Sequence, residues 1–387
     1  MIGFELNEEQ RQMQEMTHEF AEKEMRPVTA HYDETEEFPW PVIRKAADVG
    51  LLTYALPEEY GGAGVASVVT DAIVQEEIFW GCAGIGTSMG AIMLGALPIF
   101  LYGREDQKKH YLTWLTQNKP DGNPKLAAFA LTEPEAGSDA ANLKMSARKV
   151  QGGYILNGTK HFITNGGIAD LYTVFATHDS KLKSDGIDAF IVEGSAKGVI
   201  PGKKEKKMGI RASHTAQVIF EDVFVPEENR LGEEGDGLTV ALSTLDHTRA
   251  VTAAGAVGVA RAAFDAALAY SLERVQFGRP IAKQQAIQFM LSDMATEIEA
   301  ARMLCWRAAW LFDHEEPSAK ESSMAKQYAA DMCMRVTTDA VQVLGGVGYT
   351  RDYPVEKFMR DAKIMQIYEG TSQIQRIVIS RFLIGFG

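Results

Sequence analysis

The stretch "GGYILNGTKHFITNGG" (residues 152–167) marks a change in the character of this 387-residue chain. It places β-branched and aromatic residues between glycine and asparagine, a pattern typical of strands that are joined by tight turns. Similar runs follow at 171–179 (LYTVFATHD), 187–194 (IDAFIVEG) and 216–226 (AQVIFEDVFVP). The pattern predicts an antiparallel β domain in the middle of the chain.

The segments on both sides of these runs have helical periodicity. Asn7 and Gln10 have the spacing of a capping box, and "DGNPK" (121–125) predicts a domain boundary. Beyond residue 236 an apolar seam is typical of a helix bundle; its members are Ile287, Leu291, Met294, Ile298, Ala301 and Cys305. We therefore predict an α+β multidomain fold with an N-terminal α-helical domain (1–122), a central antiparallel β domain (123–235) and a C-terminal four-helix bundle (236–387).

The composition favours a globular protein that does not bind nucleic acid. The formal net charge is −13, which repels a phosphate backbone. The cysteines, Cys82, Cys305 and Cys333, lack the spacing of metal ligands and fit a reducing compartment, so we expect no metal site and a cytoplasmic location. We expect no signal or transit peptide, because the acidic start leads directly into a helix. No membrane insertion is expected, because no run of 18 apolar residues occurs.

Common nucleotide and hydrolase motifs are missing from the chain. It has no G-x-G-x-x-G after a strand, no P-loop and no G-x-S-x-G elbow. The glycine-rich segment "LGGVGYTRDYP" (344–354) is, by itself, typical of a turn between helices. In "AKIMQIYEGTSQIQR" (362–376), Glu369 stands where the apolar pattern breaks. By itself this residue is either a solvated turn carboxylate or a catalytic base, and both interpretations stay open at this point.

Several short segments, taken together and in their order along the chain, resemble the acyl-CoA dehydrogenase family. The segments 130–142 and 342–361 follow the two signatures of that family, except that Asn142 replaces a small residue. "TLDHTR" (244–249) and "YEGTSQIQR" (368–376) are most similar to the medium-chain branch. The other matching segments are "ALTEPEAGSDAAN" (130–142), "HFITNGG" (161–167), "ERVQFGRP" (273–280) and "QVLGGVGYTRDYPVEKFMRD" (342–361). The resemblance covers essentially the whole chain.

The resemblance implies an FAD that lies between the β domain and the bundle and reaches a second subunit. A homotetramer, built as a dimer of dimers, follows from this sharing. Residues assigned to the FAD of the same chain are Phe129, Leu131, Thr132, Gly137, Ser138, Phe162, Thr164, Thr371 and Gln373. Residues assigned to the FAD of the neighbouring subunit are Arg274, Gln276, Phe277, Gln285, Gln342 and Gly346. Phe162 stands where many relatives have Trp, so it keeps the aromatic contact and loses the indole N–H donor.

For the chemistry, the resemblance implies dehydrogenation of a saturated acyl-CoA to the trans-2-enoyl-CoA, as in β-oxidation of fatty acids. Glu369 is the base for the α-proton, and the β-hydrogen leaves as hydride to flavin N5. Some relatives carry the base directly before the bundle arginine, but here Thr248 occupies that position. We expect burial to raise the pKa of Glu369. The implied electron acceptor is an electron-transferring flavoprotein, and the implied substrate-binding residues are Ser138, Leu245, Asp246, Arg249 and Gly370.

The acyl group itself is predicted from the segment 80–98, which the resemblance places at the far end of the pocket. It contains no Arg or Lys, which argues against a dicarboxylic acyl-CoA because its distal charge would be unpaired. Gly86 and Gly90 are expected to widen the pocket for a neutral short- to medium-chain acyl group that is branched or alicyclic. Alternatives on the same fold are a nitroalkane oxidase, which uses Asp as base, and a DNA-associated flavoprotein, which carries a basic extension. A cofactor-free structural oligomer would leave both signatures unexplained.

Overall fold

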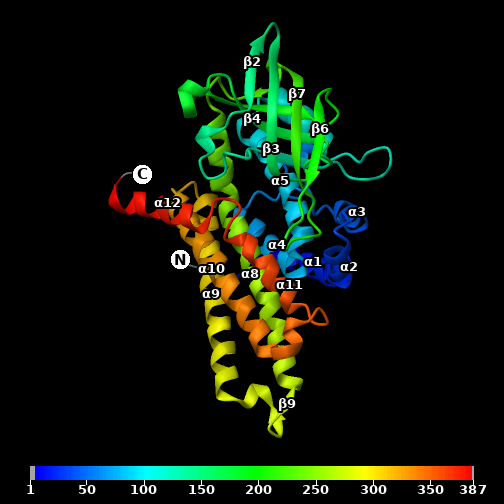
Figure 1. Ribbon diagram of the computed structural model, residues 1–387, viewed down its shortest axis with the longest axis vertical. Helices are drawn as coiled ribbons and strands as arrows, with labels where there is room; N and C mark the ends of the chain where they lie inside the picture. The colour runs from blue at the N-terminus through cyan, green and yellow to red at the C-terminus, as the bar shows by residue number, and fades with distance from the viewer. Residues whose placement is uncertain (1–4, 386–387) are drawn as a thin grey trace.

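The computed structural model describes residues 5–385, and it has the three predicted parts (Figure 1). The sheet lies at one end of the molecule, the long helices of the bundle form the other end, and the N-terminal helices lie beside the bundle. The predicted ends at residues 1 and 387 lie outside the described residues. The fold class predicted from the sequence is confirmed.

The N-terminal part is helical, as predicted, and the capping box at its start is present. Gln10 N donates to Asn7 Oδ1 (2.8 Å), and Asn7 N donates to Gln10 Oε1 (3.0 Å). Its helices are α1 (Glu8–Phe20), α2 (Thr29–Thr35), α3 (Trp40–Asp48), α4 (Val68–Gly81), α5 (Ala83–Tyr102), and the short α6 (Glu105–Gln107) and α7 (Thr113–Leu115). Of these, α4 and α5 are largely buried, so they form the centre of this part.

The central part is one sheet with the strand order β6-β7-β3-β2-β4-β5-β8, and β1 pairs with β4. The strands are β1 (Ala127–Ala130), β2 (Ser146–Val150), β3 (Gly153–Thr164), β4 (Leu171–Thr177), β5 (Ile187–Glu193), β6 (Val199–Lys204), β7 (Thr215–Pro226) and β8 (Arg230–Leu231). Most pairs are antiparallel, but β1 is parallel to β4, with Ala127 opposite Leu171, and a single bridge joins β2 and β4 in parallel. The prediction of a purely antiparallel domain is therefore wrong for these pairs. The long connection between β1 and β4, which contains β2 and β3, is what permits a parallel pair.

The C-terminal part is a bundle of α8 (Gly237–Glu273), α9 (Gln285–Asp313), α10 (Ala319–Leu344) and α11 (Val355–Met365), followed by α12 (Ser372–Ile384). A hairpin of β9 (Val275–Gln276) and β10 (Arg279–Pro280) joins α8 to α9. In the predicted α9 seam, Met294, Ile298, Ala301 and Cys305 are buried. Ile287 and Leu291, nearer the hairpin, are only partly buried.

Helix α4 is held tightly against the bundle. A Cβ atom on Gly258 of α8 would lie 2.1 Å from the carbonyl oxygen of Glu76, so the two helices approach this closely only because residue 258 is glycine. Two buried ion pairs add to this contact, because Glu76 Oε1 lies 2.8 Å from Arg261 Nη1 and 2.9 Å from Arg302 Nη2. These contacts therefore fix the position of α4, including the position of the face that does not contact α8.

Two helices, α5 and α8, are long and apolar enough to cross a membrane by length and composition. Their most apolar windows are 72% and 61% buried inside the structure, which is what the core helices of a folded domain show. The sequence criterion, an uninterrupted run of 18 apolar residues, did not select these helices, and the absence of membrane insertion stays a prediction. Their apolar side chains are covered by the sheet, by α4 and by the rest of the bundle.

Candidate active site

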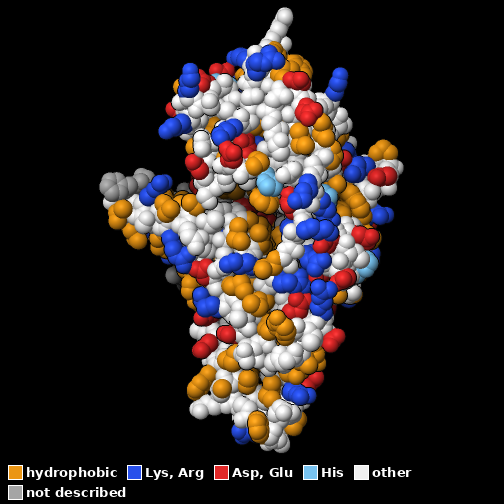
Figure 2. Space-filling model, viewed as in Figure 1, with side chains coloured by type: hydrophobic (Ala, Val, Ile, Leu, Met, Phe, Trp, Pro, Cys, Tyr) orange, Lys and Arg blue, Asp and Glu red, His pale blue; other side chains and the backbone are white. Residues whose placement is uncertain are grey.

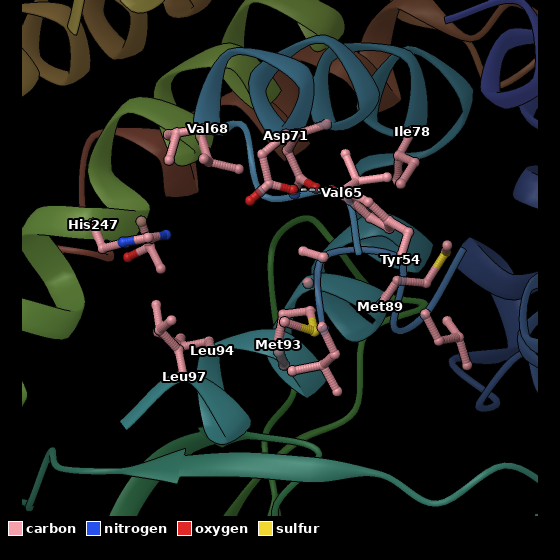
Figure 3. Close-up of a pocket in the computed structure, with 18 of the residues that line it drawn as sticks. Tyr54, Val65, Val68, Asp71, Ile78, Met89, Met93, Leu94, Leu97 and His247 are labelled. Carbon is pink, nitrogen blue, oxygen red and sulfur yellow. Dashed lines mark hydrogen bonds between the residues drawn. The ribbon is translucent and has the colours of Figure 1, made fainter. Parts of the chain in front are cut away.

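A cavity of about 490 Å³ lies where α4, α5 and α8 meet the segment that follows α11 (Figure 3). Its wall is mainly apolar, with Met89, Met93, Leu94 and Leu97 from α5 and Val251 from α8. Polar side chains interrupt this wall at two places. One place has Glu369 hydrogen-bonded to Thr248, and the other has Asp71 hydrogen-bonded to Tyr54; Thr164, Gln75 and His247 line the cavity as well.

Glu369 is positioned as a base at the first of these places. Thr248 Oγ1, from α8, donates a hydrogen bond to Glu369 Oε2 (3.2 Å). Burial raises the pKa of Glu369 above its usual value, and the charge of Lys326, the Thr248 hydroxyl and the charge of Arg249 oppose that rise. The shift has the direction expected from the sequence, and a raised pKa suits a carboxylate that must accept a proton near neutral pH.

The backbone at Glu369 is held in an unusual conformation. Glu369 and Gly370 both have positive φ angles, 55° and 84°, and a left-handed conformation is costly for a residue other than glycine. Lys326 Nζ stabilises this turn by donating to the carbonyl oxygens of Met365 (2.7 Å), Tyr368 (2.8 Å) and Gly370 (2.7 Å). Within residues 5–385 the N–H of Glu369 donates to no other group. It is therefore free to bind an acceptor that enters the cavity.

The residues after Glu369 hold the same turn from the other side. Thr371 caps α12 by accepting a hydrogen bond from Ile374 N (3.1 Å). Gln375 Nε2 donates to the carbonyl oxygens of Glu369 (3.2 Å) and Gly370 (3.1 Å). Sequence reasoning missed both Lys326 and Gln375. The signal for Lys326 was available, because it lies on the same face of α10 as the buried Ala329 and Cys333, where a charged side chain needs a specific partner.

The residues predicted to bind the substrate thioester differ in their exposure. Arg249 is only 7% exposed; its Nη1 pairs with Asp246 Oδ1 (2.5 Å), and its Nε has no hydrogen-bond partner within the described part of the chain. Leu245 is half-buried, whereas Ser138 lies exposed on the loop before β2. Arg249 thus lies beside Glu369 inside the protein, and the contacts of these residues with CoA stay a prediction.

The α5 wall of the cavity corrects one prediction. Gly90 lines the cavity, and a Cβ atom there would lie 3.3 Å from Gln75 Nε2 of α4. A Cβ atom on Gly86 would instead lie 2.8 Å from side-chain atoms of Ile78 and Phe79. Gly86 therefore permits α5 to pack on α4 and does not widen the cavity: it shares a face of α5 with Gly90, but it lies about one turn nearer the start of the helix, where Ile78 and Phe79 fill the space.

The predicted FAD residues of the β domain lie close together. His161 N donates to the carbonyl oxygen of Thr132 (2.8 Å), which joins the segment around Leu131 to the end of β3. Phe162 has a φ of 56°, is 59% exposed and stacks on His161 with the ring centroids 3.9 Å apart. Thr164, two residues further, lines the cavity. An exposed aromatic face next to the cavity fits a planar ring system such as the flavin. Phe129 instead lies in β1 opposite Thr173 and packs its ring against Phe175 (4.9 Å between ring centroids), so its contact with FAD stays a prediction.

The residues predicted to bind the FAD of a neighbouring subunit lie at the opposite end of the molecule. α8 has 37 residues, about 55 Å of helix, and Arg274 follows its last turn. Phe277 on the adjoining hairpin is 95% exposed, and Cβ atoms on Gly345 and Gly346 would meet no atom within 4 Å. Figure 2 shows apolar side chains on the surface of this end. Gln276, Gln285 and Gln342 are exposed as well. Thr248, which bonds Glu369, and Arg274 are separated by about 39 Å along the axis of α8. Binding of these open groups to the FAD of a second subunit stays a prediction.

Comparisons with known proteins agree with this geometry. The chain matches the acyl-CoA dehydrogenase N-terminal domain over residues 7–119, the middle domain over 128–223 and the C-terminal domain over 235–384. It is 45% identical over 380 residues to the short-chain specific acyl-CoA dehydrogenase of Clostridium acetobutylicum, covering 98% of this chain and 99% of the relative. This relative and the short-chain specific acyl-CoA dehydrogenase of Rattus norvegicus, 43% identical over 383 residues, indicate similarity to short-chain enzymes and not to the medium-chain branch that the sequence motifs favoured.

Two solved structures have the same fold over their full length. Butyryl-CoA dehydrogenase from Megasphaera elsdenii is 43% identical, with a TM-score of 0.95 over 99% of this chain and 100% of that chain. A chain in a structure described as the electron transferring flavoprotein of Acidaminococcus fermentans is 46% identical, with a TM-score of 0.95 and the same coverage. The chain therefore belongs to the acyl-CoA dehydrogenase family and is an FAD-dependent oxidoreductase that acts on the CH–CH bond of an acyl-CoA.

Proposed function

We propose that this enzyme dehydrogenates a short- to medium-chain acyl-CoA, branched or alicyclic and without a distal carboxylate, with Glu369 as the base. The observation that carries the proposal is the position of Glu369: its carboxylate lines the cavity, with a raised pKa, and its own N–H is unpaired. A thioester carbonyl at that N–H would place the α-carbon close to the Glu369 carboxylate. The product is the trans-2-enoyl-CoA.

In this mechanism the residues of the chain do three things. The N–H of Glu369 donates to the thioester oxygen and stabilises the negative charge that grows there, as in an oxyanion hole. The Glu369 carboxylate takes the α-proton, and Thr248 orients that carboxylate. The apolar wall from α5 excludes water from the reacting carbons. FAD, when bound beside Phe162 and Thr164, supplies the hydride acceptor for the β-hydrogen.

The substrate range follows from the wall of the cavity. No Arg or Lys is present among its lining residues, so a terminal carboxylate near Asp71 would have no cation to pair with. The volume of about 490 Å³ is within the range of pockets that hold whole small molecules, and it exceeds what a straight C4 chain needs. A branched or alicyclic acyl group uses such a cavity better than butyryl does, since each buried CH₂ contributes about 0.8 kcal/mol.

We further propose a homotetramer in which two chains share each FAD, an electron-transferring flavoprotein as acceptor, and a cytoplasmic role in β-oxidation. The separation of Arg274 from Glu369 along α8 supports sharing. Dry surroundings of the flavin favour transfer to a protein acceptor over reaction with oxygen. Steady turnover with oxygen alone that matched turnover with the acceptor protein would make this enzyme an oxidase.

The test is a panel of acyl-CoAs from C4 to C12 with branched, cyclic and dicarboxylic members. Anaerobic bleaching of the flavin would be recorded first, and kcat/KM with an electron-transferring flavoprotein second. We expect branched or alicyclic members to give the highest kcat/KM. A preference for glutaryl-CoA over every neutral acyl-CoA would contradict the proposed substrate class.

A further inference from the structure

A second group of polar side chains lines the same cavity, and the mechanism does not use it. Asp71 and Gln75 are four residues apart on α4, so they share the face that lines the cavity. Tyr54 from the preceding loop and His247 from α8 line the cavity too. In Figure 3, Asp71 and Tyr54 meet at one side of the cavity, and His247 approaches from another side.

These groups have hydrogen-bonding capacity that the protein leaves unused. The Tyr54 hydroxyl donates to Asp71 Oδ1, but within residues 5–385 Asp71 Oδ2 receives no hydrogen bond from a side chain, and the side chain of Gln75 makes none. Asp71 and Gln75 are both partly exposed and line the cavity, so their unused polar atoms are accessible to a ligand there. Two polar groups without a protein partner at one place in a mainly apolar cavity indicate a ligand whose polar group pairs with them.

We infer that the acyl tail of the substrate carries a hydroxyl group beyond the β-carbon, and that Asp71 Oδ2 accepts its hydrogen bond. This inference rests on the proposed function, since it names a feature of the acyl group that the same cavity would hold. The oxygen of such a hydroxyl would also accept a hydrogen bond from the amide of Gln75, which lies on the same face of α4. One acceptor and one donor are all that a hydroxyl requires.

The charges around the site favour a hydroxyl over other polar groups. Burial raises the pKa of Asp71 to about 6, so it is mostly ionised at neutral pH and repels a carboxylate. Burial lowers the pKa of His247 to about 4, so the imidazole brings no compensating charge. Asp313 lies nearby, but its carboxylate caps α4 by accepting from Ser67 Oγ (2.8 Å) and Val68 N (2.6 Å). An ammonium group has three N–H donors, and among the described side chains at this place only two unpaired acceptors face it, Asp71 Oδ2 and the amide oxygen of Gln75.

The experiment compares acyl-CoAs of one length and shape that end in methyl, hydroxymethyl, aminomethyl or carboxylate. The recombinant holoenzyme is used, and kcat/KM is measured for each substrate. We expect the hydroxyl substrate to exceed its methyl counterpart by tenfold or more, a coupling of about 1.4 kcal/mol. The carboxylate and ammonium substrates should be poorer than the hydroxyl one. A higher kcat/KM for the ammonium or methyl substrate would overturn the inference.

Variants separate a ligand role of Asp71 from a structural one. Asp71→Leu and Gln75→Leu should each lower the ratio of hydroxyl to methyl substrate. Tyr54→Phe removes the same internal hydrogen bond as Asp71→Leu but keeps the carboxylate, so it should preserve the ratio. If Asp71→Leu does not fold, Gln75→Leu still decides, because its side chain holds no other group in place. An unchanged ratio in both leucine variants would refute the inference.

The outcome also distinguishes this inference from the proposed function. If no acyl-CoA bleaches the flavin, the proposed function itself fails. If straight and branched alkyl substrates bleach it and the hydroxyl group brings no advantage, only the assignment of Asp71 fails.

Discussion

Lys326 Nζ lies 2.7 Å from the carbonyl oxygen of Gly370, the residue that follows the proposed base Glu369. The same ammonium also binds the carbonyl oxygens of Met365 and Tyr368. Burial lowers the pKa of Lys326 to about 8, and at neutral pH its remaining charge favours ionised Glu369. One buried lysine therefore supports both the shape of the turn and the charge of the base.

Lys326→Met should weaken both functions of this lysine. Three buried carbonyl groups would lose a charged donor, which we expect to lower the free energy of unfolding by about 3 kcal/mol or more. The pKa of Glu369 should rise further, so kcat should fall at neutral pH and recover partly at higher pH. Thermal unfolding and a pH series of flavin reduction would measure these effects. Lys363→Met is the control, because Lys363 is exposed and donates only to Gln366 Oε1 (2.8 Å); a similar loss in both variants would argue against the special role of Lys326.

Glu369→Gln should abolish proton removal while leaving the fold and FAD binding intact. A positioned general base contributes about 10² to 10⁴ in rate, so anaerobic flavin reduction by an acyl-CoA should slow by about a thousandfold. Glu58→Gln changes another carboxylate that lines the cavity and should have little effect. A loss of less than about tenfold for Glu369→Gln would show that a different base operates.

Thr248→Val should move the acidic limb of the pH profile. The Thr248 hydroxyl donates to the Glu369 carboxylate and so stabilises its ionised form. Removing that donor raises the pKa of Glu369, and activity should then be lost at a higher pH as the solution is acidified. The measurement is log kcat/KM against pH for both proteins. Thr252→Val, one turn further along α8 in the same cavity, should leave the limb in place; a shift to lower pH in Thr248→Val would contradict the assignment.

Gly90→Glu should change substrate preference, whereas Gly86→Ala should change stability. A side chain at residue 90 enters the cavity beside Gln75, so it should penalise branched and cyclic acyl groups more than straight butyryl. At residue 86 even a methyl group meets Ile78 and Phe79 at 2.8 Å, and overpacking of this kind costs about 1 to 3 kcal/mol. The ratio of kcat/KM values and the melting temperature would be compared for both variants. Equal effects of the two substitutions on the kcat/KM ratio would mean that both glycines face the cavity.

Arg274→Ala should release FAD and weaken assembly together. Arg274 is exposed at the far end of α8, where the proposed homotetramer brings in the cofactor of another chain. Flavin absorbance after gel filtration and the mass of the eluted species would report both properties in one experiment. Arg148→Ala, which removes an exposed arginine from β2, should affect neither. A stable monomer that keeps its FAD tightly would exclude a shared site.

Local patterns in the sequence determined the class of this fold and the candidate base. The runs in 152–226 have the pattern of strands, and the α9 seam has the spacing of a helix. Both patterns can be read from the sequence because they depend only on residues that are near one another along the chain. Glu369 was found through the motif around it. Glu369 and Gly370 both have positive φ angles and form one tight turn, and a tight turn depends on residues that are neighbours in the sequence.

Contacts between distant segments were decided by the tertiary structure alone. A helical pattern states which residues share a face, but it does not state which neighbour covers that face. For this reason Gly86 and Gly90 were treated alike, although one packs on α4 and the other lines the cavity. Likewise Asp71 and His247 share the cavity only because Gly258 and the ion pairs of Glu76 hold α4 against α8. Long-range packing likewise decides that β1 pairs in parallel with β4, and that Lys326 donates hydrogen bonds to the turn at Glu369.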